Sequence, residues 1–134
     1  MKQVFLIEDN EGDILLTNII LKDIDPDIQI EVAKDGAEAI ATLELIKIKR
    51  TGSRPALILL DVNLPKKNGF EVLSYIRAND FWENIPVVML TTTSIPNDRM
   101  KAFENKADSF LTKSSDLAEL QDTFSSIYDK WLKP

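Results

Sequence analysis

The chain has 134 residues, and its 22 acidic against 16 basic side chains give a net charge of −6, which argues against a nucleic-acid or anionic-membrane footprint. It contains no cysteine and no histidine, which excludes a disulfide framework, a thiolate nucleophile, a Ser-His-Asp triad and metal sites built on sulfur or imidazole. Its length and hydrophobic content of 44% predict one domain over residues 1–134 with a core of its own.

Short apolar runs alternate with longer segments of helical pattern along the whole chain. The runs that predict strands cover residues 4–7, 28–32, 56–60, 87–90 and 109–112. The segments that predict helices run from 12 to 24, from 35 to before 51, from 69 to 78, from about 96, and from the residue after Ser114 or Ser115. This order, strand then helix five times over, predicts parallel strands joined by helical crossovers.

The second run differs from the other four because it alternates apolar and polar residues, which is typical of an edge strand. The remaining runs are nearly continuously apolar, as parallel strands covered on both faces require. We therefore predict an α/β fold with a doubly wound, five-stranded parallel sheet, five helices and the flavodoxin-like strand order 2-1-3-4-5. A functional site is then expected outside the carboxyl ends of strands one and three.

Apolar side chains at helical spacing predict which face of each helix meets the core. The second helix carries an additional start signal, because Glu38 follows Asp35 by three residues in the pattern of a capping box. The apolar stripes are Leu16, Ile20 and Ile24 in the first helix, Leu73 and Ile76 in the third, Met100, Phe103 and Ala107 in the fourth, and Leu117, Leu120, Phe124, Ile127 and Trp131 in the fifth.

Charged or hydroxyl residues follow every predicted strand except the edge strand. Glu8 and Asp9 follow the first, Asp61 the third, Thr91 the fourth and Lys113 the fifth. Three carboxylates at neighbouring strand ends repel each other unless a cation neutralises them, and Mg²⁺ prefers such oxygen ligands. A lysine and a hydroxyl opposite them suit the oxygens of a phosphoryl group. The pattern therefore predicts phosphoryl chemistry with an aspartate as nucleophile.

These residues carry a family resemblance that spans essentially the whole chain. Asp61 stands in the segment Leu-Asp-Val-Asn-Leu-Pro, Gly69 follows it by eight residues, Thr91 ends Met-Leu-Thr, and Lys113 ends Phe-Leu-Thr-Lys. With Glu8 and Asp9 after the first strand, the chain resembles the receiver domains of two-component response regulators, in particular stand-alone receivers of the chemotaxis type.

The resemblance implies a phosphorylation reaction. Asp61 would accept a phosphoryl group from a phosphohistidine on a sensor histidine kinase or phosphotransfer protein. Asp9, Asp61 and the main-chain carbonyl of Asn63 would hold Mg²⁺, with Glu8 assisting through water, and Lys113 would bind the phosphoryl group. Beyond phosphorylating and dephosphorylating itself, such a protein is not an enzyme.

The resemblance also implies a switch. Thr91 would close onto the phosphoryl group and Phe110 would turn inward. This movement would change the face made by the fourth helix, fifth strand and fifth helix, which partners read. The same face is our hypothesis for a homodimer, in which Asp108 would supply a charged contact.

Two positions depart from the family pattern. Glu8 stands where the family more often has aspartate, and its extra methylene still lets it reach a metal, more readily through water. Ser114 follows Lys113 where the family usually has a proline with a cis bond. A cis bond before serine costs about 2.5–4 kcal/mol, so we expect a trans bond or a shifted loop here.

A narrower resemblance is to stand-alone receivers that serve phytochrome-type kinases, through the segments 64–73, 91–94 and 111–114 and the aromatic end with Trp131. About 20 residues follow Lys113, enough for one helix, so we expect no output domain. The longest apolar runs, of about five residues, are far shorter than a membrane span, and four apolar residues before Glu8 are too few for a signal peptide. We expect a cytoplasmic protein.

Three other functions remain open. A Mg²⁺-dependent phosphohydrolase with an aspartyl nucleophile usually sets that nucleophile two residues before another aspartate after the first strand, whereas this chain reads Glu8-Asp9-Asn10. An FMN-binding module needs a hydroxyl- and glycine-rich loop where this chain has carboxylates. A pseudo-receiver would bind partners without phosphorylation; the presence of Asp61, Thr91 and Lys113 argues against it, and Ser114 leaves it open.

Overall fold

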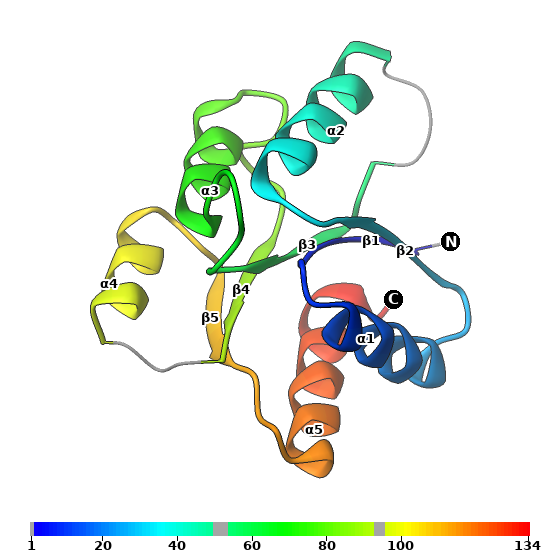
Figure 1. Cartoon of the computed structure of the whole chain (residues 1–134). Helices are drawn as coiled ribbons and strands as arrows, with labels where there is room; N and C mark the ends of the chain where they lie inside the picture. Colours follow the sequence, from blue (N-terminus) through cyan, green and yellow to red (C-terminus); the bar gives the residue numbers. More distant parts are fainter. Residues whose placement is uncertain (1, 50–53, 93–95) are drawn as a thin grey trace.

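The computed structural model describes residues 2–49, 54–92 and 96–134 (Figure 1). Strands and helices alternate through these residues. The strands are β1 (Lys2–Ile7), β2 (Ile28–Ala33), β3 (Leu57–Asp61), β4 (Val87–Thr91) and β5 (Ser109–Thr112). The helices are α1 (Glu11–Ile24), α2 (Gly36–Lys49), α3 (Gly69–Ala78), α4 (Pro96–Glu104) and α5 (Leu117–Ile127), and a π-helical turn, η1 (Tyr128–Leu132), follows α5.

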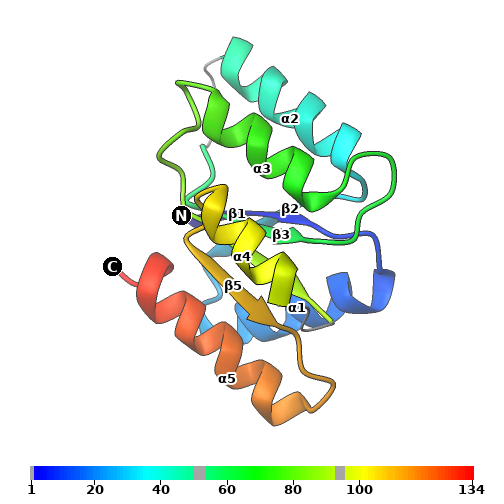
Figure 2. The same ribbon diagram turned by 90° about the vertical axis from the view of Figure 1, so that its left-hand side faces the viewer.

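All neighbouring strands are parallel, and their order in the sheet is β2-β1-β3-β4-β5. Helices α1 and α5 cover one face of the sheet, and α2, α3 and α4 cover the other (Figures 1 and 2). The predicted α/β fold with its flavodoxin-like strand order is therefore confirmed. Both faces of the central strands are covered, which explains why those strands read as continuous apolar runs.

The sheet divides the core into two layers. One layer packs the strands against α2, α3 and α4, with Leu43, Leu73 and Ile76 fully buried. The other layer packs them against α1 and α5 and includes Leu21 and Phe124. The edge strand β2 alternates as predicted over residues 28–32, because positions 29 and 31 are exposed, 28 is buried, and 30 and 32 are partly buried.

The fourth helix follows its predicted apolar face only in part. Ala107, just after α4, is buried as predicted, but Met100 and Phe103 keep 63% and 47% of their surface exposed, and Ala102 is buried instead. A helix that approaches a sheet closely needs small side chains at the contact, so the alanines face the core and the larger residues remain outside.

The C-terminal helix also departs from the prediction of one continuous stripe. Leu120, Phe124 and Ile127 are buried, but Leu117 is 53% exposed. After Ile127 the chain adopts a π-helical turn, in which the N–H of Lys133 bonds the carbonyl of Tyr128 at 2.8 Å. The wider turn changes which side chains face the core. Leu132 is buried, whereas Trp131, which α-helical spacing predicts to be buried, is only partly buried.

Helix α2 begins close to its predicted start. The Oδ1 of Asp35 accepts the Glu38 N–H at 2.7 Å, and the Glu38 carboxylate accepts the N–H of Lys34 at 3.2 Å. The reciprocal bond thus reaches one residue further back than in a standard capping box. Among the described residues, no helix is both long and apolar enough to cross a membrane.

Candidate functional site

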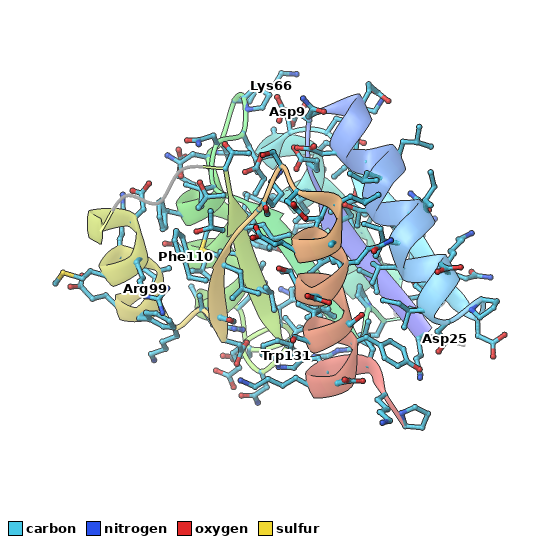
Figure 3. All side chains as sticks on the ribbon, turned by 90° about the horizontal axis from the view of Figure 1, so that it is seen from below. Asp9, Asp25, Lys66, Arg99, Phe110 and Trp131 are labelled. Atoms are coloured by element: carbon cyan, nitrogen blue, oxygen red, sulfur yellow. The ribbon has the colours of Figure 1, made fainter. Side chains whose placement is uncertain are left out.

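Three carboxylates meet at the carboxyl ends of β1 and β3, as the strand order predicts. One oxygen each of Glu8, Asp9 and Asp61 lies within 4.8 Å of the other two. Glu8 is 3% exposed, Asp61 is half-buried, and Asp9 is exposed on the solvent side. Figure 3 labels Asp9 beside the start of α1, at the same end of the molecule as Lys66 of the β3–α3 loop. Sites at this edge are typical of open parallel sheets.

The carboxyl group of Asp61 ionises less readily here than that of a solvent-exposed aspartate. Its burial and the neighbouring charge of Glu8 raise its pKa to about 7, although Lys113 and a hydrogen bond from the N–H of Asn63 act in the opposite direction. That N–H lies 3.4 Å from Oδ1 of Asp61. Clustered carboxylates with a raised pKa and oxygen-only donors fit a hard divalent cation, which would replace the missing positive charge.

Lys113 reaches the cluster from the end of β5. Its Nζ donates to Oε1 of Glu8 at 2.5 Å and to Oδ2 of Asp13 at 2.9 Å. The side chain is only 9% exposed. Burial opposes its charge, but the bonds to Glu8 and Asp13 outweigh that effect and hold the pKa of Lys113 above its usual value. The ammonium is therefore a fixed positive charge beside Asp61.

Asp13 was not predicted as a site residue. It is the third residue of α1, and its N–H bonds Oδ1 of the N-cap residue Asn10 at 2.9 Å. The only signal in the sequence is an acidic residue in the first turn of a helix, and such residues occur at many helix starts because they favour the helix dipole. Its contact with Lys113 comes from the way α1 lies against the sheet, which the sequence pattern does not specify.

Thr91 and Phe110 occupy different parts of the structure. Thr91 is fully buried at the end of β4, next to the strand that carries Asp61. Its carbonyl accepts the N–H of Lys113 at 2.7 Å, which ties the end of β5 to β4. Phe110 is 3% exposed and belongs to the core layer under α2, α3 and α4. Its side chain thus points inward, close to α4 and the labelled Arg99 in Figure 3.

The loop after Asp61 is held by close backbone contacts. The N–H of Gly69 bonds the carbonyl of Val62 at 2.9 Å, and a Cβ atom at Gly69 would lie 2.4 Å from the carbonyl oxygen of Asp61. On the other side of the loop, the N–H of Gly36 lies 3.4 Å from the carbonyl of Pro65. Asn63 is exposed within this loop. Both glycines therefore serve close backbone approach, not merely the start of a helix.

The bond after Lys113 is trans, in agreement with the prediction, because none of the peptide bonds in the described residues is cis. Ser114 is instead fixed by side-chain contacts: its hydroxyl bonds Oε2 of Glu119 at 2.6 Å and accepts the N–H of Asp116 at 3.0 Å. Next to this turn lies a cavity of about 300 Å³ between α1 and α5. It is lined by Asp13, Leu16, Thr17, Thr92, Lys113, Ser114, Ser115, Leu120 and Phe124.

Comparison with known protein families gives a match over most of the chain. The model of the family described as "Response regulator receiver domain" matches residues 4–125. The response regulator Rcp1 of Synechocystis sp. is 38% identical over 132 residues, which cover 98% of this chain and 90% of that protein.

Solved structures agree with the sequence comparison. The Mn²⁺-bound form of Rcp1 superposes with a TM-score of 0.89 at 38% identity and covers 99% of this chain and 96% of its own. The phosphorylated cyanobacterial phytochrome response regulator RcpA superposes with a TM-score of 0.90 at 37% identity and covers 98% and 94%. Both similarities extend over the strand ends that carry the acidic cluster and Lys113.

Proposed function

The chain belongs to the response regulator receiver family, and from this membership we propose that Asp61 accepts a phosphoryl group from a phosphohistidine of a partner kinase or phosphotransfer protein. The observation that carries the proposal is the arrangement around Asp61, where two further carboxylates lie within 4.8 Å and a buried ammonium lies beside them. Such a site neutralises and orients charge, which is most of what phosphoryl transfer requires.

We assign the cation to Mg²⁺, held by Asp9, Asp61 and the main-chain carbonyl of Asn63. The relative Rcp1 binds Mn²⁺ in its solved structure, and oxygen ligands suit either ion. Both oxygens of Glu8 already have protein partners, since Oε1 bonds Lys113 at 2.5 Å and Oε2 accepts the N–H of Asn10 at 3.2 Å. We therefore expect Glu8 to support the metal through water. When bound, Mg²⁺ cancels negative charge between Asp61 and the incoming phosphoryl group.

The chemical step needs an ionised Asp61. One of its carboxylate oxygens attacks phosphorus, and the bond from phosphorus to the donor's imidazole nitrogen breaks. The imidazole nitrogen keeps the electron pair of that bond and takes a proton from water. Lys113 holds one oxygen of the transferred group by a charge-assisted hydrogen bond, and the hydroxyl of Thr91 bonds another. In hydrolysis, the oxygen of a water molecule attacks phosphorus, and the bond from phosphorus to the Asp61 oxygen breaks. The carboxylate keeps the electron pair of that bond, and the proton of the water leaves with inorganic phosphate.

We further propose that phosphorylation is read at the surface made by α4, β5 and α5, with Thr91 and Phe110 as the switch residues. The ring of Phe110 is buried in this structure, which is the position that we expect in the phosphorylated chain. In the unphosphorylated chain the ring would also populate a second, outward position. The resemblance to RcpA, a cyanobacterial phytochrome response regulator, supports a phytochrome-type kinase as the partner. The chain would then act as a receiver that signals through binding.

A homodimer through the same surface is supported by the exposed Met100 and Phe103 of α4, with Arg99 lying over the ring of Phe103 at 5.5 Å. Asp108 is a poor candidate for the charged contact that we expected, because it pairs with Arg77 at 2.9 Å and accepts the N–H of Val87 at 2.8 Å. Light scattering of the chain with and without beryllofluoride tests the dimer, and a monomer in both conditions would rule it out.

The decisive experiment is the intact mass of the chain after incubation with acetyl phosphate, with and without Mg²⁺, beside the variant Asp61→Asn. We expect one added phosphoryl group that requires both Mg²⁺ and Asp61. Continued release of phosphate from small esters would favour the phosphohydrolase instead. Absence of an adduct combined with absence of a beryllofluoride complex would favour the pseudo-receiver, because beryllofluoride forms a stable mimic even where the acyl phosphate is short-lived.

A further inference from the structure

We propose that Asp13 is a positioning residue for Lys113, which holds the lysine ammonium at the phosphorylation site from outside the metal cluster. The inference deepens the proposed function and rests on it. In the described residues the clustered carboxylates that could share a metal are Glu8, Asp9 and Asp61, and Asp13 is not among them. Its role is therefore separate from metal binding and works through Lys113.

Within the described part of the chain, Glu8 and Asp13 occupy two of the donors of Lys113 and leave one free. An ammonium has three N–H groups. One donates to Glu8 at 2.5 Å and one to Asp13 at 2.9 Å, so the third remains for an oxygen of the phosphoryl group. With two donors fixed at separate points, the direction of the third is also fixed. A single partner would leave the ammonium free to rotate about that one bond.

Asp13 is a firmer anchor than Glu8 would be alone. Its backbone is held in the first turn of α1 by the cap that Asn10 provides at 2.9 Å, and the helix N-terminus favours the negative charge of its side chain. Glu8 also lies within the acidic cluster, where water held by a cation would donate hydrogen bonds to the same carboxylate. When a cation arrives there, the bond to Asp13 keeps Lys113 in place.

In the contact between Lys113 and Asp13, the lysine is the more deeply buried partner. The side chain of Lys113 is 9% exposed, against 37% for Asp13, which borders the cavity between α1 and α5. Fixing a lysine side chain removes its rotamer freedom before the phosphoryl group arrives. An ammonium that is already ordered speeds the transfer because less ordering remains for the transition state.

The test compares Asp13→Ala and Asp13→Asn with a matched control, Glu11→Ala. Glu11 is another carboxylate in the first turn of α1, but its side chain is 73% exposed and pairs with Lys34. The readouts are the rate of mass increase with acetyl phosphate and the apparent Kd for Mg²⁺, with circular dichroism as a check of folding. We expect Asp13→Ala to slow phosphorylation about tenfold, while the Kd for Mg²⁺ changes less than about threefold.

Two comparisons separate positioning from a general structural effect. Asp13→Asn keeps an oxygen that can accept from Lys113, so it should recover part of the rate, and Glu11→Ala should stay within about twofold of the wild type. In the Lys113→Ala background, Asp13→Ala should have no further effect, because the residue that it positions is gone.

The outcomes are distinct. A wild-type chain that takes no phosphoryl group and forms no beryllofluoride complex would overturn the proposed function and this role with it. A wild-type chain that is phosphorylated, together with an Asp13→Ala rate equal to that of Glu11→Ala, would overturn this role alone. Equal losses from Asp13→Ala with and without Lys113 would do the same, because the effect would then not pass through the lysine.

Discussion

Oε1 of Glu8 lies 2.5 Å from Nζ of Lys113, although the two residues are 105 positions apart in the chain. Glu8 follows β1 and Lys113 follows β5, and two other strands of the sheet, β3 and β4, lie between them. Both side chains extend across the carboxyl ends of those strands to meet, and both are almost fully buried. The ion pair thus joins the carboxyl ends of β1 and β5. The net charge around Asp61 therefore depends on both Glu8 and Lys113.

The raised pKa of Asp61 predicts a pH-dependent stability in metal-free buffer. The folded pKa of about 7 exceeds the unfolded value of about 3.9, so the folded chain binds more protons between these two values. The free energy of unfolding should therefore fall as the pH rises from about 4 to 7. Asp61→Asn removes this dependence, and we expect it to match the wild type at pH 4 and to be more stable by about 1–2 kcal/mol at pH 8, since water screens a partly exposed carboxylate.

Urea unfolding in EDTA at several pH values measures this difference. Because the other carboxylates are common to both proteins, the difference between the two curves isolates Asp61. Adding Mg²⁺ at pH 8 should stabilise the wild type more than Asp61→Asn. A gap between the two proteins that is constant with pH would contradict the assignment of the raised pKa to this residue.

Lys113→Ala is expected to change stability and metal affinity in opposite directions. It leaves Glu8 and Asp13 without their cation, one of them almost fully buried, so we expect a loss of about 2–4 kcal/mol in EDTA. The same change makes the site more negative, so Mg²⁺ should bind several-fold more tightly and restore part of the lost stability. Calorimetric titration with Mg²⁺ and urea unfolding measure the two effects. Weaker Mg²⁺ binding by the variant would contradict this charge balance.

The strand-end residues could be predicted from the sequence because parallel strands bring their carboxyl ends to one edge of the sheet. Glu8, Asp9 and Asp61 follow neighbouring strands, so their proximity required only the strand order. Lys113 was predicted to face the phosphoryl group, but its pairing with Glu8 and Asp13 was not. That pairing depends on the conformation of the lysine side chain and on the angle between α1 and the sheet. The hydrophobic periodicity of the sequence predicts neither.

The misassigned helix faces have a related cause. Periodicity ranks residues by hydrophobicity, but α4 contacts the core through small residues, so Met100 and Phe103 remain exposed. The π-helical turn after Ile127 changes the spacing of one turn only, which a pattern based on 3.6 residues per turn does not detect. Both errors concern packing against a neighbour, whereas the fold class depended only on the order of the elements.

Arg77 is predicted to hold together the end of the sheet away from the acidic cluster. Its guanidinium donates to the carbonyls of Lys106, Glu83 and Ile85 at 2.9, 3.0 and 2.7 Å, and it pairs with Asp108 at 2.9 Å. Arg77→Ala should cost about 2–4 kcal/mol of unfolding free energy, since several partners lose their donor together. Arg77→Lys should recover little, because an ammonium cannot bond four acceptors in this fixed arrangement. Thermal unfolding of both variants measures this, and an unchanged Tm for Arg77→Ala would contradict it.

Gly36→Ala is predicted to disturb the loop that carries Asp61 without touching the carboxylates. A Cβ atom at this position would lie 1.9 Å from the carbonyl oxygen of Lys67, so the start of α2 and the β3–α3 loop would have to separate. We expect a loss of about 2–4 kcal/mol in unfolding free energy and weaker Mg²⁺ binding, because that loop also presents the carbonyl of Asn63. Gly12→Ala is the matched control: it also lies in the first turn of a helix, and its nearest contact would be a side-chain atom, Oδ1 of Asn10, at 3.2 Å and not a backbone atom at 1.9 Å. If both variants unfold at the same urea concentration and bind Mg²⁺ equally, the close approach of Gly36 does not position the loop.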